Sequence, residues 1–126
     1  MNYPNVHIIH GDSGVELPKI IQNCVSPITF WLDAHYCADN AEIGELWSPI
    51  KAELEAIGKH SIKNHIILID DFRVMDNTHI DKITQKATGF PGKQKLFEQL
   101  EQINPKYTIS FLDGCETNDV VVCQVI

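Results

Sequence analysis

Acidic side chains stand at the ends of three short apolar runs, and they are the residues of this sequence best suited to chemistry. The acids are Asp12, Asp33, Asp70 and Asp71. Carboxylate oxygens are the ligands that Mg²⁺ and Ca²⁺ prefer, and carboxylates brought close together resist joint ionisation unless a cation relieves the repulsion. If Asp33 meets Asp70 and Asp71 in the fold, we expect these three side chains to hold a divalent cation such as Mg²⁺.

Polar neighbours of these acids offer further chemistry. His35 lies two residues after Asp33 and could act as a general base toward a hydroxyl on the metal, although an exposed loop histidine without function fits the same position. Asp12 and Ser13 stand just before a helical pattern, where an aspartate also serves as a helix cap or in a tight turn.

Aromatic residues near the acids have two interpretations. Trp31 lies inside an apolar run and is expected in the core. Tyr36 and Trp47 flank the loop that follows Asp33, so they could form an aromatic wall for a ring-shaped substrate.

The apolar runs that carry the acids have the length of strands. They cover residues 6–9, 28–32 and 65–69. Near-continuous apolar runs of this length are typical of parallel strands buried on both faces. Helical patterns lie between and after them: residues 13–21, residues 50–57 between Pro49 and Gly58, residues 93–103, and a weaker pattern in residues 79–88.

The end of the chain has a different pattern. Residues 107–112 alternate between polar and apolar, residues 113–118 fit a turn, and residues 119–126 form another strand. A gap of this length has no room for a crossover helix, so the two strands must run antiparallel. The sequence therefore predicts an α/β fold with three parallel strands and a C-terminal antiparallel hairpin.

Composition sets the class of protein. The 126 residues predict a single domain over residues 1–126, with 44% hydrophobic and 21% charged residues. A net charge of −7 argues against a nucleic-acid partner, and no apolar run is long enough to span a membrane. The four cysteines form no C-x-x-C pair and no export signal is apparent, so we expect reduced thiols and a cytoplasmic protein.

Three segments together resemble successive strands of a known family. They are Val6-His7-Ile8-Ile9-His10-Gly11-Asp12-Ser13, Phe30-Trp31-Leu32-Asp33-Ala34-His35 and Ile67-Leu68-Ile69-Asp70-Asp71-Phe72. Their order and spacing are similar to those of class I S-adenosylmethionine-dependent methyltransferases, and the final hairpin is similar to that family's last two strands. The resemblance covers about residues 5–126.

The resemblance implies an activity and a cofactor. In the family, the Gly-Asp-Ser position contacts the adenine of S-adenosylmethionine, which would fall on Asp12 and Ser13. The branch that methylates sugar or catechol hydroxyls holds Mg²⁺ at positions that match Asp33, Asp70 and Asp71. The implied reaction is metal-dependent O-methyl transfer to a small-molecule hydroxyl, with Asp33 and His35 as the catalytic pair.

The family's glycine-rich cofactor turn is absent from this sequence. No G-x-G-x-x-G pattern occurs, and only residues 2–5 precede the first predicted strand. The chain therefore resembles the C-terminal part of the family fold, a truncated Rossmann-like three-layer sandwich. We expect the first strand to close against the second in the order 1-2-3-5-4, with strand 5 antiparallel; a homodimer that fills the gap with a partner strand is the alternative.

Two other functions use the same acids. The first is a non-catalytic module that binds a cation or a small molecule, or that serves as an assembly partner, and the missing glycine turn favours it. The second is a metal-dependent hydrolase. Cation binding without methyl transfer would distinguish the binding module from the enzyme.

Overall fold

The computed structural model describes residues 3–35, 48–82 and 85–126. Their elements, in chain order, are α1 (Ser13–Ile21), β1 (Thr29–Leu32), α2 (Ile50–Lys59), β2 (Ile66–Ile69), the 3₁₀ turn η1 (Phe72–Val74), α3 (Lys93–Ile103), β3 (Thr108–Leu112) and β4 (Val120–Gln124). The helical patterns of residues 13–21, 50–57 and 93–103 are thus confirmed. Residues 79–88 instead contain an isolated bridge between Ile80 and Ala87. No helix among the described residues combines the length and the apolar character that a membrane crossing requires.

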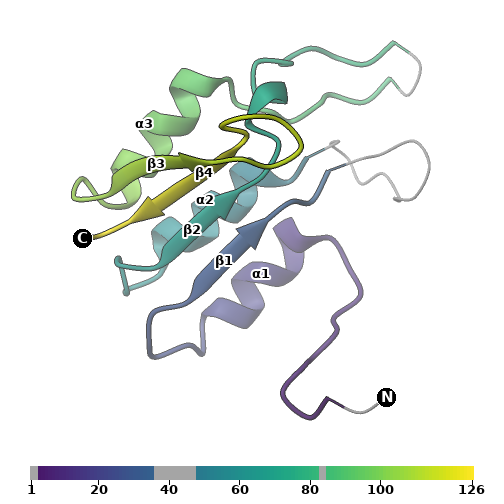
Figure 1. Ribbon diagram of the computed structural model, residues 1–126. Helices are drawn as coiled ribbons and strands as arrows, with labels where there is room; N and C mark the ends of the chain where they lie inside the picture. The colour runs from purple at the N-terminus through teal and green to yellow at the C-terminus, as the bar shows by residue number, and fades with distance from the viewer. Residues whose placement is uncertain (1–2, 36–47, 83–84) are drawn as a thin grey trace.

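The four strands form one mixed sheet in the order β1-β2-β4-β3 (Figure 1). β1 pairs with β2 in parallel, and β4 runs antiparallel to both β2 and β3. The α/β class and the antiparallel C-terminal hairpin are confirmed. The observed order also matches the last four strands of the predicted order 1-2-3-5-4.

The first predicted strand does not form, so the five-strand order is wrong. Residues 6–9 belong to no strand, and every residue from 3 to 12 is exposed. Figure 1 shows this segment on the β1 side of the molecule, separate from the sheet. A β-branched run predicts a strand from local preference, but a strand exists only with a partner, and this chain leaves the segment unpaired.

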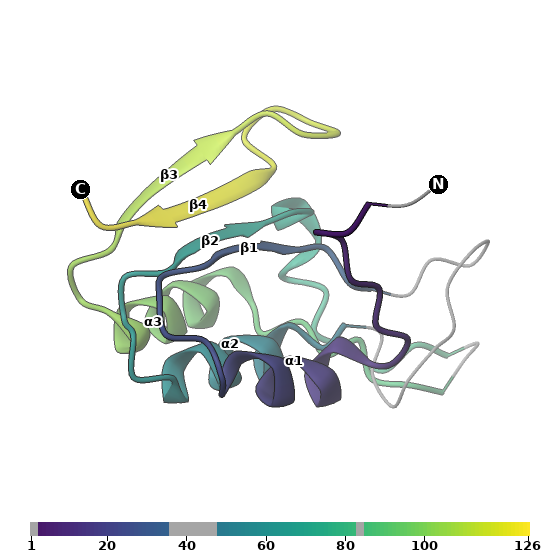
Figure 2. The ribbon, with the colours of Figure 1, turned by 90° about the horizontal axis from the view of Figure 1, so that it is seen from below.

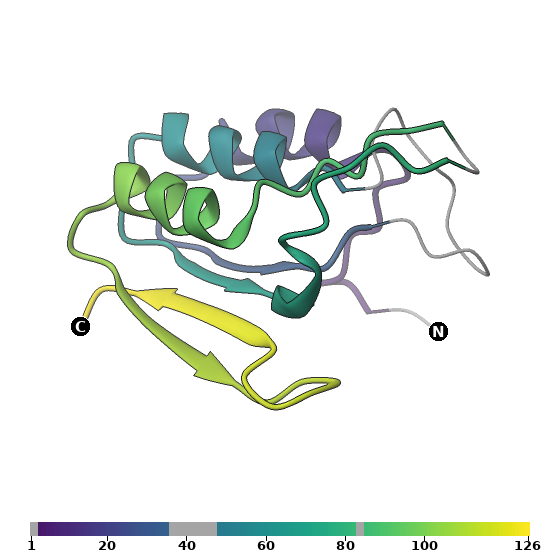
Figure 3. The same ribbon diagram turned by 90° about the horizontal axis from the view of Figure 1, so that it is seen from above.

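The helices of residues 3–35, 48–82 and 85–126 all cover the same face of the sheet, so this part of the chain has two layers and not the predicted three-layer sandwich. Figures 2 and 3 show α1, α2 and α3 on the same side. The burial of β1 alternates: Phe30 and Leu32 face the helices, and Trp31 is exposed on the opposite face. The prediction that Trp31 lies in the core therefore fails, because no described helix covers that face.

The core lies between the sheet and the helices. Leu54 and Ile57 of α2 and Leu100 of α3 are fully buried against Ile67 and the other inward side chains of the strands. These inward positions recur every second residue in the strands and every three or four residues in the helices, which is how one apolar face forms on each element.

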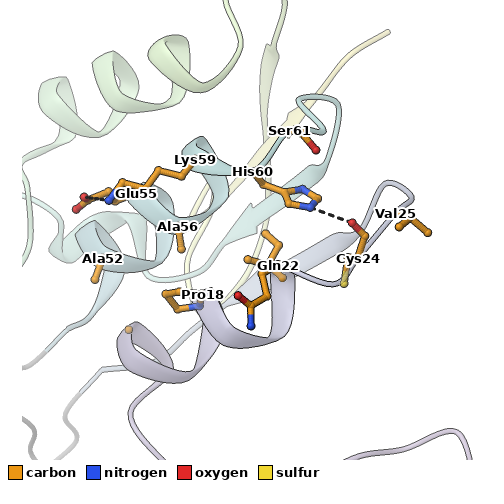
Figure 4. Close-up of a pocket in the computed structure, with 12 residues that line it drawn as sticks. Pro18, Gln22, Cys24, Val25, Ala52, Glu55, Ala56, Lys59, His60 and Ser61 are labelled. Atoms are coloured by element: carbon orange, nitrogen blue, oxygen red, sulfur yellow. Dashed lines mark hydrogen bonds and ion pairs between the residues drawn. The ribbon is translucent and has the colours of Figure 1, made fainter.

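A relay of two histidines ties α2 to the segments before β1 and β2. The amide of Ile28 donates to His65 Nδ1 (2.9 Å), so His65 carries its proton on Nε2. This proton bonds to His60 Nδ1 (2.8 Å), and His60 Nε2 donates to the carbonyl of Cys24 (3.0 Å). Figure 4 shows this last bond at the end of a groove of about 670 Å³ between α1 and α2. In the first two bonds a ring nitrogen is the acceptor, first His65 Nδ1 and then His60 Nδ1, so the complete relay requires both rings to be neutral.

The histidine relay predicts loss of stability in mild acid. Burial, the neighbouring His60 and Lys63 lower the pKa of His65 below its ordinary value. The unfolded chain therefore takes up the proton first as pH falls, so the stability should be complete above about pH 6.5 and decline below it. Urea unfolding at several pH values between 8 and 5 measures this slope.

The control compares two histidines. His65→Gln should flatten the decline, whereas His79→Gln, which removes an exposed histidine, should leave it unchanged. Equal slopes in all three proteins would show that the relay does not control the response to acid.

Candidate metal site

The parallel pairing of β1 and β2 places acidic residues at one edge of the sheet. Leu32 pairs with Ile69, and the amide of Asp70 donates to the carbonyl of Leu32 (3.1 Å). The residues that follow, Asp33 on one strand and Asp70 on the other, therefore leave the sheet side by side. The expectation that these acids meet at a common edge is confirmed.

Asp33, His35 and Asp71 form the first cluster at this edge. One ligating atom of each lies within 4.8 Å of the others. His35 Nε2 is 2.6 Å from Asp71 Oδ2 and 4.0 Å from Asp33 Oδ1. The sequence suggested His35 as a base; its place in the cluster makes it a possible ligand as well.

Asp70, Asp71 and Asp119 form a second cluster that shares Asp71 with the first. Asp119 is buried at the start of β4, and Asp119 Oδ1 accepts the amide of Arg73 (2.9 Å). The Arg73 guanidinium bonds to Asp71 Oδ1 (2.9 Å) and to Asp119 Oδ2. This second cluster therefore has its own cation, the arginine, which contacts two of its three carboxylates. In the first cluster the same arginine contacts Asp71, and no described lysine or arginine forms an ion pair with Asp33.

The backbone of Asp71 is in the left-handed region, with φ 61° and ψ 41°. Few residues other than glycine adopt this region, and aspartate is among those that tolerate it. The amide of Asp71 donates to Asp70 Oδ1 (2.8 Å), which holds the turn. This turn ends β2 abruptly and orients the Asp71 carboxylate so that one oxygen contacts Arg73 and the other contacts His35.

The two carboxylates of the first cluster have opposite pKa shifts. Burial, followed by the charges of Asp70 and Asp71, raises the pKa of Asp33. Burial also pushes the pKa of Asp71 upward, but the hydrogen bonds and charges of His35 and Arg73 outweigh it and hold that pKa below its usual range. The surroundings of Asp71 thus favour its ionised form. The surroundings of Asp33 disfavour the ionised form, and a positive charge beside it would favour ionisation.

A small cavity of about 10 Å³ lies among these side chains. Asp33, His35, Asp70 and Asp71 line it, together with Glu53 of α2. This volume is close to the minimum for one water molecule. Among the described residues, this cavity therefore has the size of an ion or a water molecule.

Asp12 and Ser13 have structural roles in this fold. Asp12 caps α1 by accepting the amide of Gly14 (2.8 Å), which agrees with the capping interpretation. Ser13 donates to Glu53 Oε1 (2.5 Å), and burial raises the pKa of Glu53. Contact of Asp12 and Ser13 with a cofactor stays a prediction.

Three further residues lie at this edge that the sequence did not predict there: Glu53, Arg73 and Asp119. A signal for Asp119 was present, because the first residue of an antiparallel strand beside β2 must lie near the carboxyl end of β2. Glu53 has no such signal, since a glutamate in an amphipathic helix is usually solvated. Tyr36 and Trp47, the proposed aromatic wall, lie outside the described residues.

Comparison with known proteins adds no relative: no family model, no curated protein and no solved structure matches this chain.

The Arg73 bridge predicts that Asp119 stabilises the fold. Asp119→Asn removes the negative charge opposite the guanidinium and places an amide against it, which should cost about 1–3 kcal/mol of unfolding free energy. Urea denaturation measures this change. Glu116→Gln is the matched control, since Glu116 is an exposed acid of the same hairpin loop. Equal stability of the two variants would contradict a structural role for the bridge.

Proposed function

We propose that this protein binds a divalent cation at Asp33, His35 and Asp71. The observation that carries the proposal is the convergence of three ligating atoms within 4.8 Å from the ends of two neighbouring strands. The ion-sized cavity and the raised pKa of Asp33 support it, because a cation beside Asp33 would relieve the repulsion that this carboxylate meets.

The ligand set favours a transition metal over Mg²⁺. An imidazole nitrogen together with carboxylates suits Mn²⁺, Fe²⁺ or Zn²⁺, whereas Mg²⁺ binds oxygen ligands almost exclusively. If His35 is not a ligand, the oxygens of Asp33, Asp70 and Asp71 remain as the Mg²⁺ set expected from the sequence. The metal preference therefore reports whether His35 is a ligand or a base.

The surrounding residues would prepare the site for such an ion. Arg73 holds Asp71 Oδ1 and leaves Asp71 Oδ2 directed toward His35. Arg73 is itself held by Asp119, which is buried. A bound cation would supply Lewis-acid chemistry, orienting and acidifying a hydroxyl group.

Titration calorimetry with Mn²⁺, Zn²⁺ and Mg²⁺ tests the metal site. Asp33→Asn should weaken binding of the preferred ion at least tenfold, because it removes a charged ligand. His35→Gln should weaken Mn²⁺ and Zn²⁺ more than Mg²⁺.

Asp113→Asn is the matched control for these variants. Asp113 is an exposed aspartate outside both clusters, so this variant should bind as the unmodified protein does. Absence of binding for all three ions, or equal loss in the Asp33 and Asp113 variants, would overturn the proposal.

The second candidate is metal-dependent O-methyl transfer from S-adenosylmethionine to a small-molecule hydroxyl. The specific observation that favours it is the antiparallel β4 inserted between β2 and β3, which is similar to the final hairpin of the family that the sequence resembles. In this reaction Asp33, Asp70 and Asp71 would hold the metal, and His35 would take the proton of the hydroxyl. The missing glycine-rich turn keeps cation binding as the first candidate.

Calorimetry with S-adenosylmethionine and its demethylated product tests this second candidate. If methyl transfer is the function, both should bind at millimolar concentration or tighter in the presence of the preferred ion. Ser13→Ala should weaken that binding, since the resemblance places the adenine beside Ser13. Cation binding without heat from either compound would leave the cation-binding module as the function.

A further inference from the structure

An unpaired apolar segment precedes α1. It comprises residues 3–10, all of them exposed, including Val6 (56%), Ile8 (92%) and Ile9 (52%). Its β-branched residues favour an extended backbone, and it carries no lysine, arginine, aspartate or glutamate. An exposed apolar segment without lysine, arginine, aspartate or glutamate is a common mark of an interaction surface.

An unpaired strand edge lies on the same side of the molecule. β1 ends the sheet order and pairs only with β2, so the backbone groups along its outer edge have no strand partner among the described residues. β1 also lacks charged residues, and Trp31 at its centre is 56% exposed. Long charged side chains are a common protection of edge strands, and β1 has none.

The exposed area of these two elements approaches that of a stable interface. The exposed apolar residues are Tyr3, Val6, Ile8, Ile9 and Trp31. From their exposed fractions they present roughly 700 Å² of surface, against the ~800 Å² that each partner contributes to a standard protein interface.

We infer that residues 6–9 of one copy pair with the β1 edge of a second copy, in a reciprocal strand-exchanged dimer. Each copy supplies one strand and one edge, so a two-fold arrangement gives both segments a partner and covers both β1 edges. The segment stands apart from the β1 of its own chain in Figure 1, so it does not occupy that edge.

The distribution of charged residues favours contact between two copies at residues 3–10 and β1 over contact elsewhere. Two copies of net charge −7 repel each other over most of their surface. The segment and β1 are free of charged residues, so they can approach without burying an ion, as the depletion of charge at interface cores requires.

Sedimentation equilibrium over a range of protein concentrations tests the dimer. The unmodified protein should sediment at twice the mass of the chain at micromolar concentration. Ile8→Lys should shift it to monomer, raising the dissociation constant at least a hundredfold. Val25→Lys is the matched control, because Val25 is also 92% exposed but lies in the loop between α1 and β1. The control should remain dimeric.

Amide hydrogen exchange distinguishes pairing of residues 6–9 with a second copy from pairing with β1 of the same chain. In the exchanged dimer, the amides of residues 6–9 should be protected at high protein concentration and lose their protection on dilution. Protection that is independent of concentration would mean that the segment pairs with its own β1, and the inference would be wrong. A monomer at every concentration, or a dimer unaffected by Ile8→Lys, would also overturn it.

Discussion

The parallel ladder between β1 and β2 determines where the candidate ligands lie. Four residue pairs make this ladder, and the last of them, Leu32 with Ile69, places Asp33 beside Asp70. The register is itself determined by packing, because Leu32 and Ile69 are buried beneath the helices. A slip of one residue would turn these side chains toward solvent and move the acids apart, at the cost of the whole inward face of the strand. The same apolar contacts that stabilise the fold therefore assemble the acidic edge.

The Asp71 carboxylate takes part both in a stabilising ion pair and in the proposed metal site. One carboxylate oxygen is neutralised by Arg73, which the buried Asp119 holds, and the other contacts His35. A cation at this second oxygen would replace a hydrogen bond without disturbing the arginine bridge. The Asp70–Asp71–Asp119 group thus contacts an internal cation, the Arg73 guanidinium, and the ion proposed at Asp33, His35 and Asp71 would be an external one.

Local patterns predicted most of the elements and the common acidic edge, because helix periodicity, short apolar runs and a brief hairpin connection act over few residues. The predictions that failed concern features that depend on residues far away along the chain. The run of residues 6–9 has the composition of a strand but no ladder, and Trp31 lies on a face that no described helix covers. A short apolar run does not show whether the strand it forms is buried on one face or on both. Arg73 and Glu53 were missed because their partners, Asp119 and Ser13, are 46 and 40 residues away along the chain.

The open edge and the acidic site belong to the same short strand. Among the strands of the described residues, β1 pairs with β2 alone, and the segment after its last residue carries Asp33 and His35. A four-residue strand with a single described partner strand is held by few hydrogen bonds. Pairing of a second strand along the outer edge would fix β1 on both sides and restrict the position of Asp33. A cation that needs Asp33 and Asp71 at a fixed separation would then bind the paired form more tightly, and by linkage the cation would favour the pairing. The proposed dimer and the proposed ion site would therefore be coupled through β1.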